Sequence, residues 1–366
     1  MKTLTVTTQT TSYPVYIGVA LLSQLTQLLK PLPAYQSSAD ILLISNETVY
    51  PLYGAQVVRS LENGGKRVHS FLLPDGEQYK TWDSAGEILA FALEKQLSRK
   101  TLLVALGGGV VGDIAGFVAS IYLRGIPFVQ IPTTLLAQVD SSVGGKVAVN
   151  HQLGKNMIGS FYHPEAVIGD LDTLSSLPER EWISGLAEVV KYGVLWDADF
   201  FAFLASKQQA VERRDPTVLA GIIYRCCEIK AEVVGEDETE QGLRAVLNLG
   251  HTAGHAIERA TNYCQYSHGE AVAIGMVVAV KLACSYGMLS STEADTIQSV
   301  LADYRMPLTL PDKPVETILE GLRFDKKAVG FNVTFILPTK IGQVEIVPAV
   351  DMEQVKAVLL TMYNKE

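Results

Sequence analysis

The order of strand-like and helical segments constrains the fold of this 366-residue chain most strongly. Helical patterns at residues 52–62, 82–96 and 113–123 alternate with short apolar runs at residues 3–8, 13–18, 41–45, 68–73, 101–106, 128–131 and 166–168. Such alternation predicts a parallel α/β sheet joined by helical crossovers. Hydrophobic residues make up 48% of the chain and charged residues 19%, which supplies ample material for a core.

The pattern changes after about residue 177, where helical segments follow one another. They lie at 180–195, 200–211, 217–234, 251–261, 270–286, 292–304 and 352–362, with strand-like runs only at 333–337 and 343–347. We therefore expect an α/β Rossmann-like nucleotide-binding domain at residues 1–175. A mainly α-helical domain that binds metal and substrate is expected at residues 176–366.

Charge and cysteine content narrow the partners and the compartment. The formal net charge of −9 argues against general nucleic-acid binding but permits a locally basic pocket. The four cysteines form no CxxC pair, which is typical of reduced thiols. The first ten residues lack the apolar segment of a signal peptide, and the most apolar stretch, 271–284, is shorter than the ~20 residues of a membrane span. We expect a cytoplasmic protein with no membrane partner.

A glycine-rich segment, residues 107–113, follows an apolar strand and opens a helix. Gly107, Gly109 and Gly112 match GxGxxG, and glycines allow a phosphate to approach the backbone at a helix N-terminus. Two interpretations fit this segment: a nucleotide site, or a tight strand–helix turn without a ligand. The motif favours the nucleotide site. No acidic residue ends the next strand, so the ordinary Rossmann binding mode is not indicated.

A second glycine-rich patch carries two lysines. Residues 140–146 (DSSVGGK) precede Lys155 and Asn156, and small residues beside cationic groups suit a phosphate-bearing substrate. Each lysine alone also fits a solvated surface. Their shared occurrence in turns favours a binding cleft.

Three of the six histidines fall within 18 residues. His251 and His255 are four residues apart, so a helix presents them on one face. This spacing predicts them as joint metal ligands, and ordinary surface histidines are the alternative. Glu188, inside an apolar helical segment, is a candidate carboxylate ligand or a structural partner of Lys191.

Six segments resemble the 3-dehydroquinate synthase family of sugar phosphate cyclases. They are 75–80 (DGEQYK), 107–113 (GGGVVGD), 138–146 (QVDSSVGGK), 155–161 (KNMIGSF), 185–192 (GLAEVVKY) and 247–258 (LNLGHTAGHAIE). The matches occur in order over most of the chain. Ala253 and Phe324 depart from the family pattern, where an aromatic residue and an arginine are expected. The resemblance implies a lyase that converts 3-deoxy-D-arabino-heptulosonate 7-phosphate to 3-dehydroquinate and phosphate in the shikimate pathway.

The resemblance also implies roles for individual residues. It makes Glu188, His251 and His268 the ligands of zinc or cobalt, in place of the pair that spacing predicts. Residues implied to contact NAD are Asp75, Gly76, Glu77, Gln78, Tyr79, Lys80, Gly109, Val110, Val111, Gly112, Asp113, Thr133, Thr134, Lys146, Lys155, Thr173, Leu174, Ser175 and Ser176. Residues implied to act on the substrate are His255, Lys146, Lys191, Lys230, Arg244, Asn248, Asn156, Asp140, Lys326, Lys327 and Arg124. Arg124 would reach the neighbouring subunit's site, so a homodimer is expected.

Three other functions remain as alternatives at this point. They are a sister cyclase that acts on sedoheptulose 7-phosphate, a metal-dependent polyol dehydrogenase, and a non-catalytic sensor of NAD or metal. The segments around Lys155 and His251 resemble the dehydroquinate form. The intact set of Glu188, His251 and His268 counts against the sensor.

Overall fold

The structure, a computed structural model, describes residues 1–323 and 333–363. The chain groups into two compact units. Unit 1 comprises Met1–Leu177 and Arg214–Thr239, and unit 2 comprises Pro178–Arg213 and Glu240–Glu366. The single cut at residue 175 stays a prediction, and the units differ from it because helix α9 (Pro216–Glu236) belongs to unit 1. Lys326 and Lys327 lie outside the described residues.

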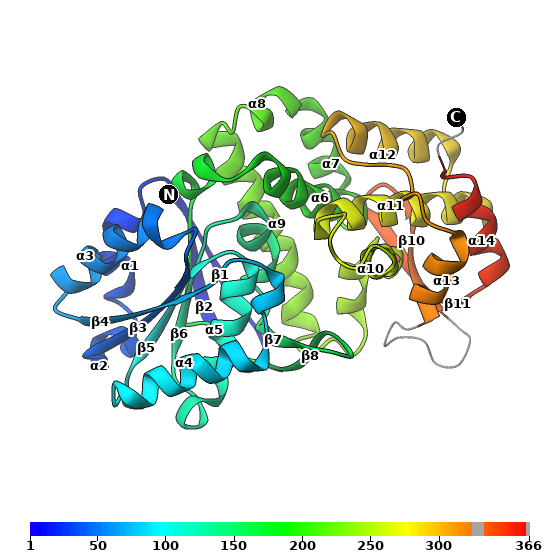
Figure 1. Ribbon diagram of the computed structural model, residues 1–366. Helices are drawn as coiled ribbons and strands as arrows, with labels where there is room; N and C mark the ends of the chain where they lie inside the picture. The colour runs from blue at the N-terminus through cyan, green and yellow to red at the C-terminus, as the bar shows by residue number, and fades with distance from the viewer. Residues whose placement is uncertain (324–332, 364–366) are drawn as a thin grey trace. The chain divides into compact units, whose positions relative to one another are not determined.

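Unit 1 is built on a seven-stranded sheet in the order β1-β2-β9-β6-β5-β3-β4 (Figure 1). The strands are β1 (Lys2–Thr7), β2 (Ser12–Gly18), β3 (Asp40–Asn46), β4 (Arg67–Leu73), β5 (Leu102–Gly107), β6 (Phe128–Pro132) and β9 (Ala166–Asp170). β1 pairs antiparallel with β2, and the other neighbours pair parallel. The predicted α/β fold class is confirmed, with one antiparallel strand added at an edge.

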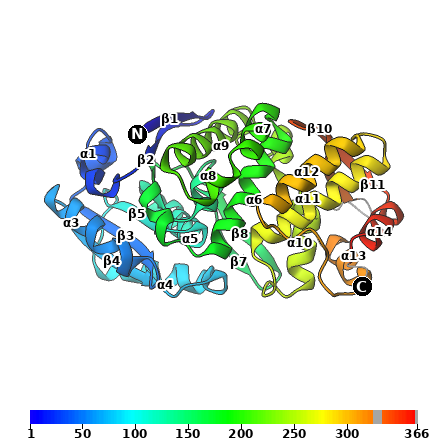
Figure 2. The same cartoon turned by 90° about the horizontal axis from the view of Figure 1, so that it is seen from above.

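Helices cover both faces of this sheet (Figure 2). Leu42 and Ile44 of β3 join the core under α4 (Trp82–Glu94) and α5 (Gly109–Ile121). Ile41 and Leu43, which point to the opposite face, join the core with α1 (Leu25–Leu29), α2 (Pro33–Ser37) and α3 (Ala55–Asn63). A parallel sheet buried on both faces explains why its strands read as continuous apolar runs.

A hairpin that the sequence did not predict lies beside α5. Its strands are β7 (Lys146–His151) and β8 (Gly154–Phe161), which pair antiparallel. Val147 and Val149 of β7 join the core under α5, whereas most residues of β8 are exposed. Short turns complete unit 1: η1 (Leu22–Gln24), η2 (Tyr50–Gly54), η3 (Glu77–Tyr79), η4 (Tyr122–Arg124), η5 (Ala137–Ser141) and η6 (Leu171–Ser176).

Unit 2 is mainly helical, as predicted. Its elements are α6 (Glu179–Leu195), α7 (Ala198–Ser206), α8 (Gln208–Glu212), η7 (Leu243–Asn248), α10 (His251–Ala260), α11 (His268–Ser285), α12 (Ser291–Asp303), α13 (Val315–Arg323), β10 (Val333–Lys340), β11 (Gln343–Val350) and α14 (Met352–Leu360). The sequence did not predict α13, although its buried Val315, Ile318 and Leu322 have helical spacing.

Helix α11 is the central apolar helix of unit 2. It is long and apolar enough by length and composition to cross a membrane, but 72% of it is buried inside the fold. Its buried residues run from Gly269 to Ala283. A helix that is apolar on all sides is typical of a buried core helix, so α11 serves as the core element on which other helices pack.

Candidate functional site

Helices α6 and α11 approach backbone to backbone at one glycine. A Cβ atom at Gly269 would stand only 2.0 Å from the carbonyl oxygen of Ser184. The Ser184 hydroxyl accepts a hydrogen bond from the Gly269 amide at 3.0 Å. This contact sets His268, the first residue of α11, beside Glu188, which lies one turn after Ser184 on α6.

A second glycine contact positions the start of α10. A Cβ atom at Gly275 of α11 would stand 1.9 Å from the carbonyl oxygen of Gly250. Gly250 precedes α10 with a φ of +79°, a left-handed conformation that favours glycine. His251 therefore begins α10 close to α11.

The two contacts bring Glu188, His251 and His268 together, and we call these residues the metal set. Oε1 of Glu188 lies 3.6 Å from Nε2 of His251 and 3.5 Å from Nε2 of His268. Tetrahedral ligands with bonds of about 2.0–2.1 Å to zinc lie about 3.3 Å apart, so the spacing fits one cation. Two imidazoles and one carboxylate are also a typical donor set of catalytic zinc sites, which leave a position for substrate.

Neighbouring acceptors orient both imidazoles of the metal set. Nδ1 of His251 lies 3.2 Å from the Leu249 carbonyl oxygen, and Nδ1 of His268 lies 3.6 Å from Oε2 of Glu258. Acceptors at Nδ1 favour the tautomer whose Nε2 can bind a metal. Glu258 was not among the predicted site residues. The available signal was a glutamate directly after the apolar pair Ala256-Ile257 of a helical segment, and in the structure Glu258 is only 3% exposed.

Lys191 completes the surroundings of Glu188. Its Nζ lies 2.5 Å from Oε2 of Glu188, and both side chains are buried. Because Oε1 faces the imidazoles and Oε2 faces Lys191, the ion pair with Lys191 leaves Oε1 in a position compatible with a role as metal ligand. Burial and the charge of Lys191 lower the pKa of His251 to about 3. Burial also lowers the pKa of His268, but Glu188 and Glu258 outweigh it and raise that pKa to about 10. A cation at this site would displace the His268 proton.

His255 lies beside the metal set. The side chain is exposed, and its ring centroid stands 5.4 Å from that of His251 and 6.1 Å from that of His268. Among the described residues, two groups of side chains could hold a metal ion. One group is Glu188, His251 and His268, and the other is His255, Glu258 and His268. Neither group contains both His251 and His255.

Two further predicted residues, Arg244 and Asn248, lie on η7 in unit 2. Arg244 is 1% exposed, and Nδ2 of Asn248 donates a hydrogen bond to Oε1 of Glu240 at 2.8 Å. Glu240 was not predicted as a site residue. In the sequence, Glu240 is an acidic residue shortly before the histidines, and nothing distinguishes it there from an ordinary surface charge.

Among the described residues, the N-cap position of α5 in unit 1 supplies no side-chain cap. Its N-cap residue is Gly108, and the following Gly109 faces the Ser141 hydroxyl. The amide of Thr133 bonds the Gly107 carbonyl oxygen at 2.9 Å. The buried Thr133 hydroxyl makes no hydrogen bond within the described part of the chain. Open amide groups and a buried hydroxyl beside them fit a phosphate-bearing nucleotide.

Charged residues from separate segments of unit 1 meet near this helix. Nζ of Lys80 lies 2.5 Å from Oδ2 of Asp113 and 2.6 Å from Oδ1 of Asn156. Burial raises the pKa of Asp113, and the opposing charge of Lys80 does not reverse this change. Burial alone would lower the pKa of Lys80, but the charge of Asp113 outweighs burial, so the pKa of Lys80 is raised. Lys230 of α9 bonds the carbonyl oxygen of Asp140 at 2.8 Å and also contacts its carboxylate.

The remaining predicted residues of unit 1 lie on several separate segments. Asn46 and Thr48 donate hydrogen bonds to the two carboxylate oxygens of Asp75 at 2.6 and 2.9 Å. Thr173, Leu174, Ser175 and Ser176 lie on η6. Lys146 begins β7, Lys155 lies near the start of β8, and Arg124 is exposed at the end of η4.

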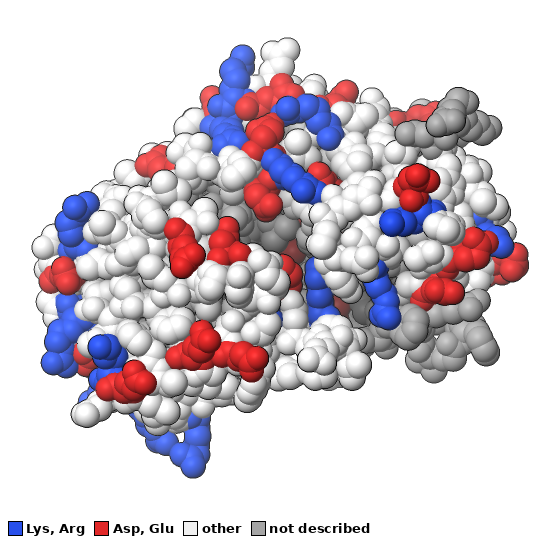
Figure 3. Space-filling model, in the orientation of Figure 1, with Lys and Arg blue, Asp and Glu red and all other residues white. Residues whose placement is uncertain are grey.

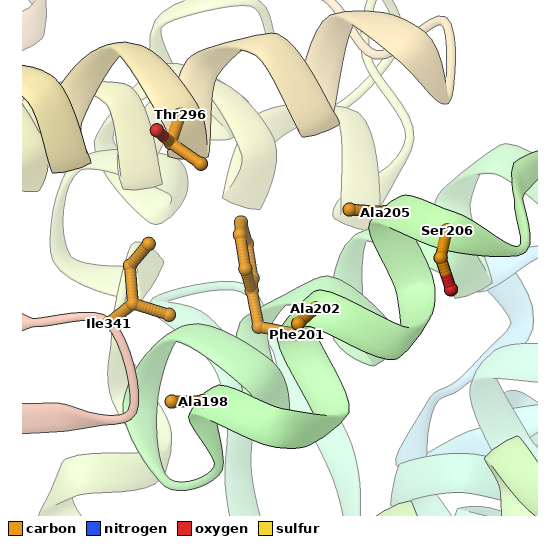
Figure 4. A pocket seen from close by; sticks show the side chains of 7 residues that line it. All are labelled: Ala198, Phe201, Ala202, Ala205, Ser206, Thr296 and Ile341. Carbon is orange, nitrogen blue, oxygen red and sulfur yellow. The ribbon is translucent and has the colours of Figure 1, made fainter.

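An apolar hollow of about 560 Å³ lies elsewhere in unit 2, between α7, α12 and Ile341 (Figure 4). Its lining residues are Ala198, Phe201, Ala202, Ala205, Ser206, Thr296 and Ile341. They offer no titratable or metal-binding side chain. The hollow therefore lacks the chemistry that the metal set supplies.

Comparison with known proteins gives one consistent family. The model of the 3-dehydroquinate synthase N-terminal region matches residues 70–184, and the model of the C-terminal region matches residues 185–328. A 3-dehydroquinate synthase from Desulforamulus reducens is 47% identical over 360 residues, which cover 98% of this chain and 99% of that protein.

Solved structures of related cyclases share the fold. A 2-deoxy-scyllo-inosose synthase with carbaglucose-6-phosphate, NAD⁺ and Co²⁺ has a TM-score of 0.90 and 26% identity, and covers 99% of this chain and 100% of its own. A 2-epi-5-epi-valiolone synthase from Streptomyces hygroscopicus with NAD⁺ and Zn²⁺ has a TM-score of 0.88 and 29% identity, with 96% and 97% covered. The full-length match and the metal set agree, and the chain belongs to the 3-dehydroquinate synthase family, a family of phosphate-eliminating lyases.

Proposed function

We propose that this family member performs its synthase reaction with a divalent metal at Glu188, His251 and His268 and with NAD at the start of α5. The substrate is 3-deoxy-D-arabino-heptulosonate 7-phosphate, and the products are 3-dehydroquinate and phosphate. The observation that carries the proposal is the placement of Glu188 Oε1 within 3.6 Å of Nε2 of both histidines. Zinc and cobalt are the proposed metals, because two imidazoles and one carboxylate suit either ion.

The bound groups would supply hydride exchange and polarisation of substrate oxygens. The chain's own residues orient the substrate and stabilise charge. Lys191, buried beside Glu188, presents a cation at the metal set. Arg244 on η7 supplies donors for substrate oxygens, and the amide oxygen of Asn248 can accept from a substrate hydroxyl. His255 stands beside the metal set as a proton donor or acceptor.

In unit 1, the proposed NAD site combines the open start of α5 with the turn at Asp75–Lys80. Lys80 is held by Asp113 and Asn156, so its ammonium group is fixed where a negatively charged ligand meets the helix N-terminus. Lys146 and Lys155, at the starts of β7 and β8, and Lys230, beside Asp140, supply further positive charge. Their cationic groups suit the phosphate and carboxylate of the substrate.

A homodimer is part of the proposal. Arg124 is exposed at the end of η4. A residue that reaches the site of a neighbouring subunit must be exposed when one subunit is considered alone. The hairpin also exposes Leu153 (81%), Met157 (44%) and Phe161 (43%), and exposed apolar groups that cluster on one element are typical of an interface.

On the face shown in Figure 3, acidic and basic side chains are interspersed. The four cysteines without disulfides support a cytoplasmic location.

The test is phosphate release from two substrates in parallel. Purified protein with NAD and zinc is given 3-deoxy-D-arabino-heptulosonate 7-phosphate or sedoheptulose 7-phosphate, with a chelator control. We expect metal-dependent release of phosphate from the first substrate, formation of 3-dehydroquinate and no net NADH. Release only from the second substrate would contradict the proposal. Net NADH with simple polyols, and no phosphate from either sugar, would identify a dehydrogenase instead.

A further inference from the structure

His163 and Glu238 form a buried pair that the proposed mechanism does not use. Nε2 of His163 lies 2.9 Å from Oε1 of Glu238, and the two side chains are 7% and 8% exposed. His163 follows β8, and Glu238 follows α9, so the pair joins segments 75 residues apart. A polar pair at this depth needs a structural or functional reason, because burying such groups is costly.

The pair has further partners from the start of the chain. The Thr10 hydroxyl donates to the same Oε1 of Glu238 at 2.5 Å. Burial raises the pKa of Glu238, but hydrogen bonds from Thr10 and His163 outweigh it and hold that pKa below its usual value. Glu238 is therefore a carboxylate, and the Nε2–H of His163 donates to it.

The other side of the imidazole packs against the turn of Gly144, Gly145 and Lys146, which we call the glycine turn. A Cβ atom at Gly145, whose φ is +70°, would stand 2.8 Å from two ring atoms of His163. The Gly144 amide donates to the Tyr13 hydroxyl at 3.2 Å, and the Tyr13 ring lies 5.8 Å from the His163 ring. His163 and Tyr13 thus hold the glycine turn from behind.

We infer that His163 and Glu238 are positioning residues that fix the glycine turn and thereby place Lys146 for the substrate. The inference rests on the proposed function, which assigns Lys146 to the site. Glu238 anchors the imidazole, the imidazole supports Gly145, and Lys146 is the next residue along the chain. If the ring loses its anchor, the turn gains freedom and the lysine loses its fixed position.

Two amide substitutions that differ in reach by one methylene group provide the test. In His163→Gln the amide nitrogen reaches about as far as Nε2, whereas in His163→Asn it stops at the depth of Nδ1 and cannot reach Glu238. The matched controls are His69→Gln and His69→Asn. His69 also pairs with a carboxylate in unit 1, because its Nε2 lies 3.0 Å from Oδ1 of Asp40, but it lies on β4.

We expect His163→Asn to raise KM for the sugar phosphate about tenfold, with His163→Gln within about threefold of wild type. Both His69 variants should keep the wild-type KM. The amide proton of Gly144 should exchange with solvent faster in His163→Asn but not in His163→Gln. Equal behaviour of the Gln and Asn variants in both measurements would overturn the inference. Hydrogen exchange needs no substrate, so it tests the inference even if the wild-type protein releases no phosphate. A failure of the wild-type protein to release phosphate would count against the proposed function alone.

Discussion

The helices α5 and α11 begin in contrasting ways. At the start of α11, the Ser267 side chain accepts from the Glu270 amide and the Glu270 carboxylate accepts from the Ser267 amide at 2.6 Å. This reciprocal capping box satisfies amide groups that would otherwise face solvent or a ligand. At the start of α5, the N-cap residue Gly108 has no side chain, so within the described part of the chain this position supplies no side-chain cap to the first-turn amides.

The contrast separates two uses of a helix N-terminus. The start of α11 is closed by its own residues, and its first residue, His268, contributes a side chain to the proposed metal site. The start of α5 is open, so its backbone is the proposed binding group for the phosphates of NAD. One site therefore depends on side-chain placement by helix packing, and the other depends on leaving the backbone accessible.

Substitution of Glu188 should have the largest effect. Glu188→Gln removes the charge that faces both imidazoles and leaves Lys191 buried beside a neutral amide. We expect metal affinity to fall more than about a hundredfold, because loss of a ligand should cost more than loss of a residue that only supports a ligand. Phosphate release should fall to a matching extent. Metal content after dialysis and turnover measure both.

Glu179→Gln is the matched control, because Glu179 lies on the same helix but is exposed and pairs with Arg305. It should retain metal and activity. Full activity of Glu188→Gln in metal-depleted buffer would refute the ligand assignment.

Gly269→Ala tests whether helix packing places the metal set. The new Cβ atom would collide with the Ser184 carbonyl oxygen at 2.0 Å and force α6 and α11 apart. We expect the free energy of unfolding to fall by about 1–3 kcal/mol. Metal affinity should fall about tenfold or more, as for loss of supporting contacts. Zinc titration and urea unfolding report the two effects.

The control for this substitution is Gly221→Ala in α9, where a Cβ atom meets no heavy atom within 4 Å. It should stabilise the protein by up to about 1 kcal/mol, because alanine favours a helix. Normal zinc binding by Gly269→Ala would show that the glycine contact does not set the ligand geometry.

The metal set illustrates how far the sequence could reach. Helical spacing predicts His251 and His255 on one face, yet it cannot report which side chains another helix brings near. Glu188 and His268 reach His251 through backbone contacts at Gly269 and Gly250, and no periodicity reveals such contacts. The set Glu188, His251 and His268 came from resemblance to the family, and its role remains a proposal.

The two units differ in what their sequences revealed. The apolar runs of unit 1 predicted its parallel sheet, because strands buried on both faces carry a strong signal. The sequence did not predict the β7–β8 hairpin. Gly144 and Gly145, which precede β7, indicate a turn, and the largely exposed β8 lacks the apolar pattern of a buried strand. Lys80, Asp113 and Asn156 meet only because separate strands and turns end near one another, which a linear sequence does not show.

Capping α5 should produce a smaller effect that is specific to NAD. Gly108→Asp places a carboxylate at the N-cap, where it can accept from the open amides and repel phosphate. We expect NAD to bind about tenfold more weakly, since electrostatic effects of this kind reach ~1–2 kcal/mol. The free energy of unfolding should stay the same or rise. NAD titration and thermal unfolding measure the two quantities.

Gly108→Ala serves as the control for bulk, because any Cβ atom at this position would approach Thr134 at 3.0 Å. If the alanine variant weakens NAD binding as much as the aspartate variant, the effect is steric and the open helix N-terminus is not the binding group. Zinc binding should be unchanged in both variants, because the metal set belongs to unit 2.

The smallest expected effect comes from removing the charge of Glu270 at the start of α11. Burial raises the pKa of Glu270, but Arg180 and the Ser267 amide outweigh it and hold that pKa below its usual value. A carboxyl whose folded pKa is depressed stabilises the protein above its unfolded pKa, and this stabilisation disappears as pH falls through the folded pKa. Glu270→Gln should therefore lower the free energy of unfolding by about 0.5–1 kcal/mol at neutral pH and by nothing once the wild-type carboxyl is protonated. Urea unfolding of both proteins with chelator, from neutral to acid pH, measures the difference. A constant difference across that range would mean that the charge of Glu270 does not stabilise the start of α11.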